Sequence, residues 1–368
     1  MCNKPTVCIF GKLPPPYMGP AIATQILLQS GLKNNFNLVH IDTKINEDLK
    51  SMGSWNFKKV IKNIGIYYKI VKTGIHTKPN LVLIPISQST VGFIKDSFYI
   101  LLSRLFCKKI VLHLRGSEFK IWMDRSSILT RSYVKMTFKL CAGVIVLGNN
   151  LRYLFEGFFS EDKIFVTPNG GDYIIPNRTL PDSSNTQILY LGNLQSSKGI
   201  EDLIESIRLL PNEIVNRISV NVLGGWRDEQ TKKHCLDKIN QNNLPITIHS
   251  PDKSEQKLQM MSNSDIFVFP PRAPEGHPWV IVEAMAAGLP IISTDRGAIV
   301  ESVKHDENGF IVPLSDPQAI ANHIKELINF PEKRQRMGQN SRKHYLTNFT
   351  EATMVENLTQ IFHKAMKN

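Results

Sequence analysis

Short apolar runs alternate with amphipathic stretches along most of the chain. Those in the first half are Thr6–Phe10, Asn37–Asp42, Leu81–Ile86, Ile110–Leu114, Val144–Leu147 and Ile164–Val166. Those in the second half are Ile188–Leu191, Ile218–Leu223, Ile246–Ile248, Ile266–Phe269, Pro290–Ser293 and Phe310–Val312. Short apolar runs between polar segments predict buried strands of parallel sheets.

Stretches with apolar residues at helical spacing separate these runs. They are Ala21–Lys33, Thr90–Phe106, Leu129–Leu140, Gly199–Leu210, Glu229–Gln241, Glu255–Met261 and Pro278–Ala287, and three more follow near 316–329, 332–346 and 351–366. Buried strands that alternate with helices are typical of sheets covered on both faces. Two series of similar length therefore predict an α/β protein with two doubly wound, Rossmann-like domains that face each other across a cleft.

The predicted domain boundary follows a turn signal, Pro168-Asn169-Gly170-Gly171, and a polar stretch over 176–186. We therefore expect an N-terminal domain over 1–178, a second domain over 179–350, and a final helix over 351–368 that packs back towards the first domain. Ligands of open parallel sheets bind outside the carboxyl ends of the strands, so the loops that follow the strands are the ones to search for chemistry.

Composition adds a strong charge asymmetry. The 368 residues fit about two domains, and 42% hydrophobic with 21% charged residues excludes a disordered chain. Residues 1–178 hold 24 Lys and Arg against 10 Asp and Glu, an excess of +14, whereas the remainder holds 20 against 22. The basic half predicts an anionic partner: nucleic acid, anionic lipid or a phosphorylated acceptor. Five cysteines without a CxxC pair favour reduced thiols in the cytoplasm.

The basic half contains a candidate membrane helix over Ser54–Ile75. One side carries Lys58, Lys62, Lys69 and Lys72, and the other carries Val60, Ile64, Tyr67, Tyr68, Val71 and Ile75, after Trp55 and Phe57. Such a helix can lie on an anionic membrane. The alternative is a surface helix whose apolar side covers a sheet.

The strongest chemical signal is the segment from Glu275 through Gly276, His277, Pro278 and Trp279 to Glu283. Glu283 is the single charged residue between Pro278 and Thr294. A carboxylate on an apolar helix needs partners, and ligand hydroxyls or a basic side chain would serve. Glu275 precedes this helix, whose free N–H groups can bind a diphosphate.

Two further segments follow predicted strands. Asn193 and Lys198 follow Ile188–Leu191, where Lys198 opposes the dipole of the next helix unless an anion binds or water screens it. His113, Arg115 and Glu118 follow a first-domain strand, and His113 is either catalytic or structural. The loop 11–20, which includes Gly19, could present backbone N–H groups to a phosphate.

Several motifs are missing from the sequence. There is no GxGxxG after the first strand and no GxxxxGK[ST], which disfavours a dinucleotide dehydrogenase and a P-loop enzyme. There is also no DxD, HExxH, CxxC or GxSxG motif. No bound cofactor or metal is therefore expected.

Taken together, these segments resemble retaining glycosyltransferases of the family four type, which have the two-domain GT-B architecture. The Glu-x7-Glu spacing of Glu275 and Glu283 with the EAMAAGLPII run carries the resemblance. It implies that Glu283 binds the ribose of a nucleotide-sugar, Glu275 contacts the transferred sugar, Lys198 holds the diphosphate, and His113 lies beside the sugar ring.

The remaining roles are also implied by the resemblance. Gly19, Asn193, Gly276, His277, Pro278 and Trp279 would bind the donor, and Arg115 and Glu118 would contact the acceptor or a phosphate. Asn193 stands where many members have Arg, and Arg115 where a second His is common, so Arg115 would replace the missing charge.

The reaction expected from this resemblance is metal-independent hexosyl transfer, with retention, from a nucleotide-diphosphate sugar to a glycan or lipid-linked hydroxyl in bacterial surface polysaccharide synthesis. The enzyme would be cytoplasmic and peripheral at the inner face of the membrane, which it would meet through its basic half. A nucleotide-sugar epimerase or hydrolase of the same architecture, and a non-catalytic membrane- or nucleic-acid-binding protein, are the alternatives.

Overall fold

The computed structural model describes residues 4–15, 18–44, 57–181, 185–250 and 254–367. The chain forms two compact units. Unit 1 comprises residues 1–171 and 351–368, and unit 2 comprises residues 172–350.

Unit 1 contains a parallel six-stranded sheet with the order β2-β1-β3-β4-β5-β6. Its strands are β1 (Thr6–Gly11), β2 (Asn37–Asp42), β3 (Leu81–Ile86), β4 (Ile110–Leu114), β5 (Gly143–Val146) and β6 (Ile164–Val166). Each coincides with a predicted strand to within one residue at either end, because apolar β-rich segments leave little choice of register in a sheet buried on both faces.

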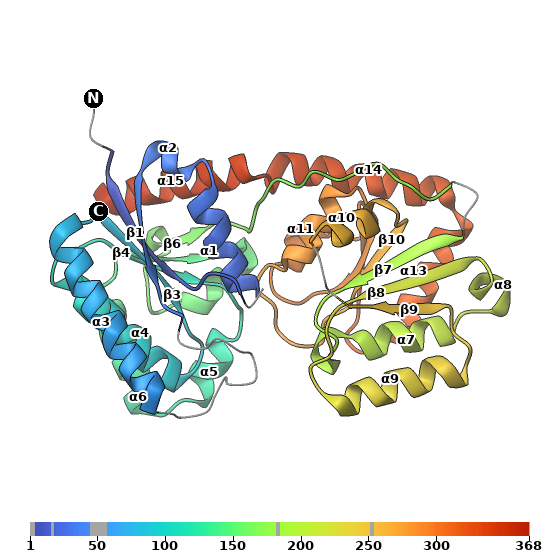
Figure 1. The fold of residues 1–368 in the computed structure, drawn as a ribbon, viewed down its shortest axis with the longest axis horizontal. Coiled ribbons are helices and arrows are strands. Elements are labelled where there is room, and N and C mark those ends of the chain that lie inside the picture. The colour runs from blue at the N-terminus through green and yellow to red at the C-terminus, as the bar shows by residue number, and fades with distance from the viewer. Residues whose placement is uncertain (1–3, 16–17, 45–56, 182–184, 251–253, 368) are drawn as a thin grey trace. The chain divides into compact units, whose positions relative to one another are not determined.

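Helices cover both faces of this sheet (Figure 1). The helices and 3-10 helices are α1 (Gly19–Gln29), α2 (Leu32–Asn35), α3 (Phe57–Thr77), α4 (Thr90–Arg104), α5 (Phe119–Arg125), α6 (Ile128–Phe138), η2 (Asn149–Phe155), η3 (Glu161–Lys163) and α15 (Glu351–Lys367). The predicted helix over 21–33 is divided at Ser30, where the backbone is extended and the hydroxyl donates to the carbonyl of Leu27.

Alternation along the strands divides the core of unit 1 into two layers. Val7 and Ile9 pack in one cluster with Leu358 and Phe362 of α15. The intervening Phe10 contacts Tyr99 of α4 on the other face, with ring centroids 5.7 Å apart. The last helix of the chain is therefore part of the core of unit 1.

The side of α3 that is buried differs from the one predicted from the sequence. Ile66 and Ile70 are buried, whereas Ile64, Tyr68 and Ile75 of the predicted apolar side are 59–69% exposed. The helix therefore has two apolar sides, and the pattern alone does not decide which one covers the sheet. Residues 54–56, which include Trp55, and the side chains of Phe57, Lys58 and Val60 lie outside the described part of the chain.

Unit 2 repeats this architecture with the order β12-β11-β10-β7-β8-β9. Its strands are β7 (Thr186–Leu191), β8 (Ile218–Leu223), β9 (Ile246–His249), β10 (Ile266–Phe269), β11 (Ile291–Thr294) and β12 (Gly309–Val312). The helices are η4 (Ser196–Lys198), α7 (Ile200–Arg208), α8 (Asn212–Val215), α9 (Glu229–Gln241), α10 (Ser254–Ser262), α11 (Trp279–Ala286), α12 (Ile299–Ser302), α13 (Pro317–Asn329) and α14 (Pro331–Asn348).

The boundary between the units falls after Gly171, earlier than the predicted position after Arg178. The segment in between is attached to unit 2. Tyr173 and Ile175 pack against its core, and the Arg178 guanidinium pairs with Asp265 at 3.0 Å. These contacts are long-range, so the polar composition of the segment did not reveal them.

Both sheets have a point at which the strand order reverses. In unit 1 it lies between β1 and β3, and in unit 2 between β7 and β10. The connections on the two sides leave in opposite directions at such a point, which opens a crevice at the carboxyl ends of the strands. These two edges are the places to look for sites.

Candidate functional site

The reversal point of unit 2 brings Lys198 and Glu275 together. Lys198 ends η4 after β7, and Glu275 lies in the loop between β10 and α11. The Lys198 Nζ atom donates to the Glu275 Oε1 atom, and the side chains are 24% and 12% exposed. Lys198 therefore has a carboxylate partner that offsets its position at the start of α7.

Backbone contacts fix the two loops that carry this ion pair. Gly199 has φ +77°, and a Cβ there would collide with the carbonyl oxygen of Pro270. The backbone N–H groups of Arg272 and Ala273 donate to the carbonyl of Ser197 at 3.0 and 3.1 Å. A glycine is thus required where the loop after β7 meets the loop after β10.

Arg272 joins the same loops through its side chain, which the sequence analysis did not single out. Its Nε and Nη2 atoms donate to the Asp202 carboxylate at 2.7 and 2.5 Å, and Nη1 donates to Glu201 at 2.9 Å. Asp202 is buried, so the bidentate pair satisfies its charge and holds the loop on α7.

Asn193 is linked to a second arginine that the sequence analysis missed. The Arg227 Nη2 atom donates to the Asn193 Oδ1 atom at 2.6 Å. The hydroxyl of Tyr190 donates to the carbonyls of Asn193 and Lys198 at 3.3 and 3.1 Å. Arg227 follows Gly224 and Gly225 at the end of β8, and that glycine pair was the available signal.

Glu283 lies buried in α11, where its carboxylate is half satisfied. The Lys257 Nζ atom of α10 donates to Oε1 at 2.5 Å, whereas Oε2 has no hydrogen-bond partner among the described residues. Burial raises the pKa of Glu283, and Lys257 opposes this shift. The basic partner anticipated as one alternative is thus present as a lysine, and one oxygen stays available to a ligand donor.

The residues between the two glutamates are mainly structural in this arrangement. Gly276 accepts the Ala298 N–H at 2.7 Å, and Pro278 is the N-cap of α11. His277 is buried and hydrogen-bonded to Ser302 at 2.6 Å, and burial together with His344 lowers its pKa to about 3. Trp279 is 9% exposed at the first position of α11.

In unit 1, His113 and Arg115 project from β4 and the residues after it, on the side of α1. The ring nitrogens of His113 are buried without hydrogen-bond partners among the described residues. Burial, and then the charge of Arg115, hold its pKa well below the ordinary value. Arg115 donates to the Pro20 carbonyl at 2.5 Å, and burial lowers its pKa to about 10, so it stays charged at neutral pH.

Arg115 also lines a pocket of about 270 Å³ at the reversal point of unit 1. The pocket carries the basic side chains of Lys12, Lys44, Lys95 and Arg115. Among the described residues that line it, the one acidic side chain is that of Asp96, which pairs with Lys95 at 3.0 Å and accepts the Ser87 N–H at 2.7 Å. The excess of positive charge makes this pocket suited to an anion.

The other predicted unit 1 residues lie near this pocket or beyond it. Gly19 starts α1, and its neighbours Met18 and Pro20 line the pocket. Glu118 is the exposed N-cap residue of α5, and the lining residues on that side end at Gly116.

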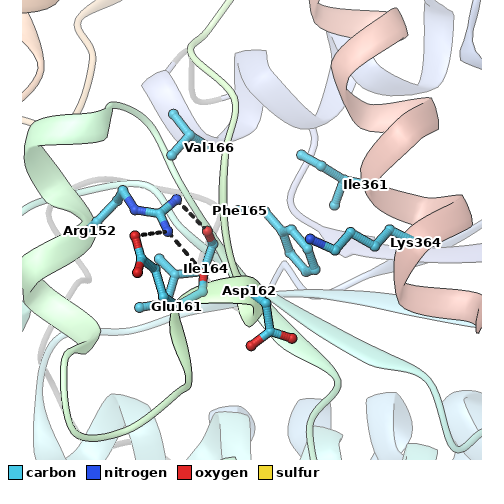
Figure 2. Close-up of a pocket in the computed structure, with 8 residues that line it drawn as sticks. All are labelled: Arg152, Glu161, Asp162, Ile164, Phe165, Val166, Ile361 and Lys364. Atoms are coloured by element: carbon cyan, nitrogen blue, oxygen red, sulfur yellow. Dashed lines mark hydrogen bonds and ion pairs between the residues drawn. The ribbon is translucent and has the colours of Figure 1, made fainter. Parts of the chain in front are cut away.

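A second pocket of unit 1 lies between α15 and the segment from η2 to β6 (Figure 2). The Arg152 guanidinium there donates to the carbonyls of Ile164 and Glu161 at 2.7 and 2.9 Å, and Lys364 lies over the ring of Phe165. None of the predicted site residues lines it.

Known sequences resemble about half of this chain. Residues 174–344 match the family model "Glycosyl transferases group 1". The matched residues lie within unit 2. A capsular polysaccharide biosynthesis glycosyltransferase of Staphylococcus aureus is 29% identical over 187 residues, which are 50% of this chain and 48% of that protein.

A putative colanic acid biosynthesis glycosyltransferase of Escherichia coli is 27% identical over 174 residues, which are 45% of this chain and 42% of that protein. The chain spans about half the length of the curated relatives it matches.

Solved structures match over almost the entire chain. HepE of Anabaena in complex with UDP-glucose has a TM-score of 0.71 at 17% identity, over 96% of this chain and 98% of that one. The sucrose-phosphate synthase of Thermosynechococcus elongatus has a TM-score of 0.75 at 16% identity, over 98% of both chains. These likenesses establish the fold: two Rossmann-like α/β domains, the GT-B architecture that the sequence predicted.

Proposed function

We propose that this protein transfers a hexosyl group from a nucleotide-diphosphate sugar to a hydroxyl of a glycan or lipid-linked acceptor, with retention at the anomeric carbon and without a metal ion. The observation that carries the proposal is the Lys198–Glu275 ion pair at the reversal point of unit 2. It places a cation and a carboxylate at the edge where parallel sheets bind ligands.

The donor would bind along the β7–β10 edge of unit 2. Its diphosphate would contact Lys198 and the N–H groups at the start of α11, which has no side-chain cap. The Oε2 atom of Glu283 would accept hydrogen bonds from the ribose hydroxyls. Glu275 would bind hydroxyls of the transferred sugar, and Asn193, held by Arg227, would contact the diphosphate.

The chemistry requires stabilisation of a leaving group. As the bond between the anomeric carbon and the phosphate oxygen breaks, its electron pair stays on the diphosphate and positive charge develops on the sugar. Lys198 and the N-terminus of α11 stabilise the negative charge in place. The acceptor oxygen forms the new bond to the anomeric carbon, and its proton passes to the leaving phosphate oxygen. The neutral imidazole of His113 would contact the sugar ring.

The acceptor would use the pocket of unit 1. The cations of Lys12, Lys44 and Arg115 there suit an acceptor that carries a phosphate or diphosphate. A lipid-linked diphosphate is such an acceptor, and it would bring the protein to the inner face of the cytoplasmic membrane. Relatives named for capsule and colanic acid synthesis support a role in bacterial surface polysaccharide synthesis.

The test measures first the binding of a nucleotide-sugar and then the transfer of its sugar to an acceptor. UDP-glucose is the first donor to try, because a structural neighbour binds it. We expect UDP-glucose or another nucleotide-sugar of a panel to raise the melting temperature. At a concentration of a hundredfold its Kd, the ligand should add about 2.7 kcal/mol to the free energy of unfolding. Transfer to a diphosphate-containing acceptor should give an anomeric configuration, read by NMR, equal to that of the donor.

The outcomes of this test separate the proposal from its alternatives. Epimer formation or free sugar in the absence of acceptor would identify an epimerase or hydrolase instead. Salt-sensitive binding to nucleic acid with no stabilisation by any nucleotide-sugar would identify a non-catalytic binding protein. Inversion of the anomeric configuration would contradict the retaining mechanism.

A further inference from the structure

Exposed apolar side chains are concentrated on one group of helices in unit 1. Among the described residues, thirteen of the nineteen large apolar side chains that are exposed lie on α3 to α6 or at the end of α4. They are Ile64, Tyr68, Ile75, Val91, Ile94, Phe98, Leu101, Leu105, Ile121, Ile128, Leu129, Tyr133 and Met136. Single exposed apolar residues are ordinary, but a concentration of them marks an interaction surface.

Helix α4 carries the most regular part of this surface. Val91, Ile94, Phe98, Leu101 and Leu105 recur every three or four residues and are 43–74% exposed. This spacing places them on one side of the helix. The opposite side, which carries Phe93 and Ile100, is buried. A helix with a buried side needs no second apolar stripe for folding.

Helices α3 and α6 extend the surface on either side of α4. Figure 1 shows the three helices side by side, and α4 packs against both neighbours. Tyr133 of α6 shares a hydrogen bond of 2.6 Å with Ser97 of α4, and the ring of Tyr67 of α3 packs at a tilt against Phe98 with ring centroids 5.6 Å apart. Ile64 and Tyr68 of α3 and Leu129 and Met136 of α6 add exposed apolar groups.

The charges on these helices have one sign. Exposed basic residues include Lys69 and Lys72 of α3, Arg104 of α4 and Lys135 of α6. Across the described parts of α3, α4 and α6, the one acidic side chain is that of Asp96, which is 2% exposed and paired with Lys95. On α3, α4 and α6, an apolar surface with basic residues around it and no exposed carboxylate matches the anionic headgroups and acyl chains of a bilayer. The exposed carboxylates of Glu118 and Asp124 lie at the N-cap of α5 and within it.

We infer that α3, α4 and α6 form a docking face by which unit 1 lies on an anionic membrane surface. Apolar side chains of the α4 stripe enter the boundary between headgroups and acyl chains, and the lysines contact the phosphates. The inference specifies the proposed membrane contact, yet it rests on the exposure and charge of these helices and not on the proposed transfer activity. The second occupant that such a face could have, another copy of this chain, is an outcome of the test.

The test is co-sedimentation of the full chain with vesicles, without donor or acceptor. Wild type should bind vesicles of phosphatidylglycerol and phosphatidylcholine, and should bind pure phosphatidylcholine at least about tenfold more weakly. The double variant Leu101→Ser/Leu105→Ser should lose about tenfold or more in affinity for the anionic vesicles. Lys69→Glu/Lys72→Glu should lose binding most strongly at low salt.

A matched control uses unit 2, where Phe330 and Leu346 are 58% and 54% exposed. Phe330→Ser/Leu346→Ser should bind vesicles like wild type, and circular dichroism checks that each variant is folded. Equal vesicle binding by wild type and the folded Leu101→Ser/Leu105→Ser variant would overturn the inference. So would a wild-type dimer in ultracentrifugation that this variant abolishes, because the face would then belong to a second copy. Since no sugar is transferred in the assay, failure here leaves the proposed activity to its own test.

Discussion

The two units share a strand topology but differ in how charge is arranged where the strand order reverses. In unit 2 the cations there have carboxylate partners: Lys198 with Glu275, Lys257 with Glu283 and Arg272 with Asp202. In unit 1 the described lining of the pocket holds Lys12, Lys44, Lys95 and Arg115 against the single carboxylate of Asp96.

This difference indicates which role each of the two edges suits. Paired charges are positioned by their partners, so unit 2 has a site of fixed geometry, as transition-state stabilisation requires. Like charges gathered in a pocket repel one another, and a bound anion removes this repulsion. The pocket of unit 1 is therefore suited to bind an anion. In the proposed function, the residues of unit 2 therefore perform the chemical step and the pocket of unit 1 binds the charged acceptor.

The largest expected effect comes from breaking the ion pair of unit 2. Lys198→Ala should lower kcat for sugar transfer by about 10²–10³-fold, because it removes a charge aimed at the leaving diphosphate. The measurement is steady-state kinetics at saturating donor. The matched control is Lys333→Ala, which removes a lysine paired with Asp306 and Glu326 of the same unit. An equal loss in both variants would show that the effect is structural.

The next effect concerns the pocket of unit 1. Lys12→Met/Lys44→Met should raise the KM for a water-soluble, diphosphate-containing acceptor by about tenfold or more, since a hydrogen bond to a charged group is worth about 1.5–3 kcal/mol. The KM for the donor should not change. Lys33→Met/Lys108→Met removes two cations of unit 1 from outside the pocket and should alter neither constant. A rise in the donor KM alone would reverse the assignment of the two units.

Much of the fold could be predicted because its information is local. The apolar runs identified every strand of both sheets, whereas the boundary between the units falls directly after the turn at 168–171 and not after Arg178 as predicted. The error in α3 arose because its sequence pattern allows two interpretations that are equally good. Helix α3 has two apolar sides, and only its neighbours decide that Ile66 and Ile70 are the ones buried.

The candidate site divides in the same way. Glu283 stood out because a lone carboxylate in an apolar helix is unusual in any sequence. The basic residues that hold the site did not stand out, because lysines and arginines are common in any sequence: Lys257 pairs with Glu283, Arg272 with Asp202, and Arg227 with the side chain of Asn193. The burial of His277 likewise depends on Ser302 and Phe349, which are distant in sequence.

A third prediction separates stability from binding at Glu283. Glu283→Gln should weaken donor binding by about tenfold, because the amide presents one acceptor where the carboxylate has two, and hydrogen bonds to a charged group are the stronger ones. Binding of the nucleotide-sugar measured by calorimetry checks this.

The same variant should be more heat-stable than wild type at neutral pH. The pKa of Glu283 is raised in the folded state, so the wild type loses stability as pH rises through the interval between the ordinary Glu pKa of about 4.3 and the raised value. Glutamine has no proton to lose, so the difference in melting temperature should appear above that interval and vanish below it. A variant less stable than wild type at pH 7 would mean that the pair with Lys257 outweighs the burial.

The smallest expected effect tests whether Arg227 supports the diphosphate site. Arg227 is exposed and reaches the site through Asn193, so Arg227→Ala should weaken donor binding only about two- to fivefold, as for exposed charged contacts. The loss should shrink at high salt if the guanidinium acts by its charge, and should persist if it acts by positioning the Asn193 side chain. Arg217→Ala, a guanidinium of unit 2 bound to Asn329 instead, is the control and should leave donor affinity unchanged. If Arg227→Ala loses as much donor affinity as Lys198→Ala does in the same binding assay, the diphosphate contacts Arg227 directly. The site of unit 2 would then include a cation without a carboxylate partner.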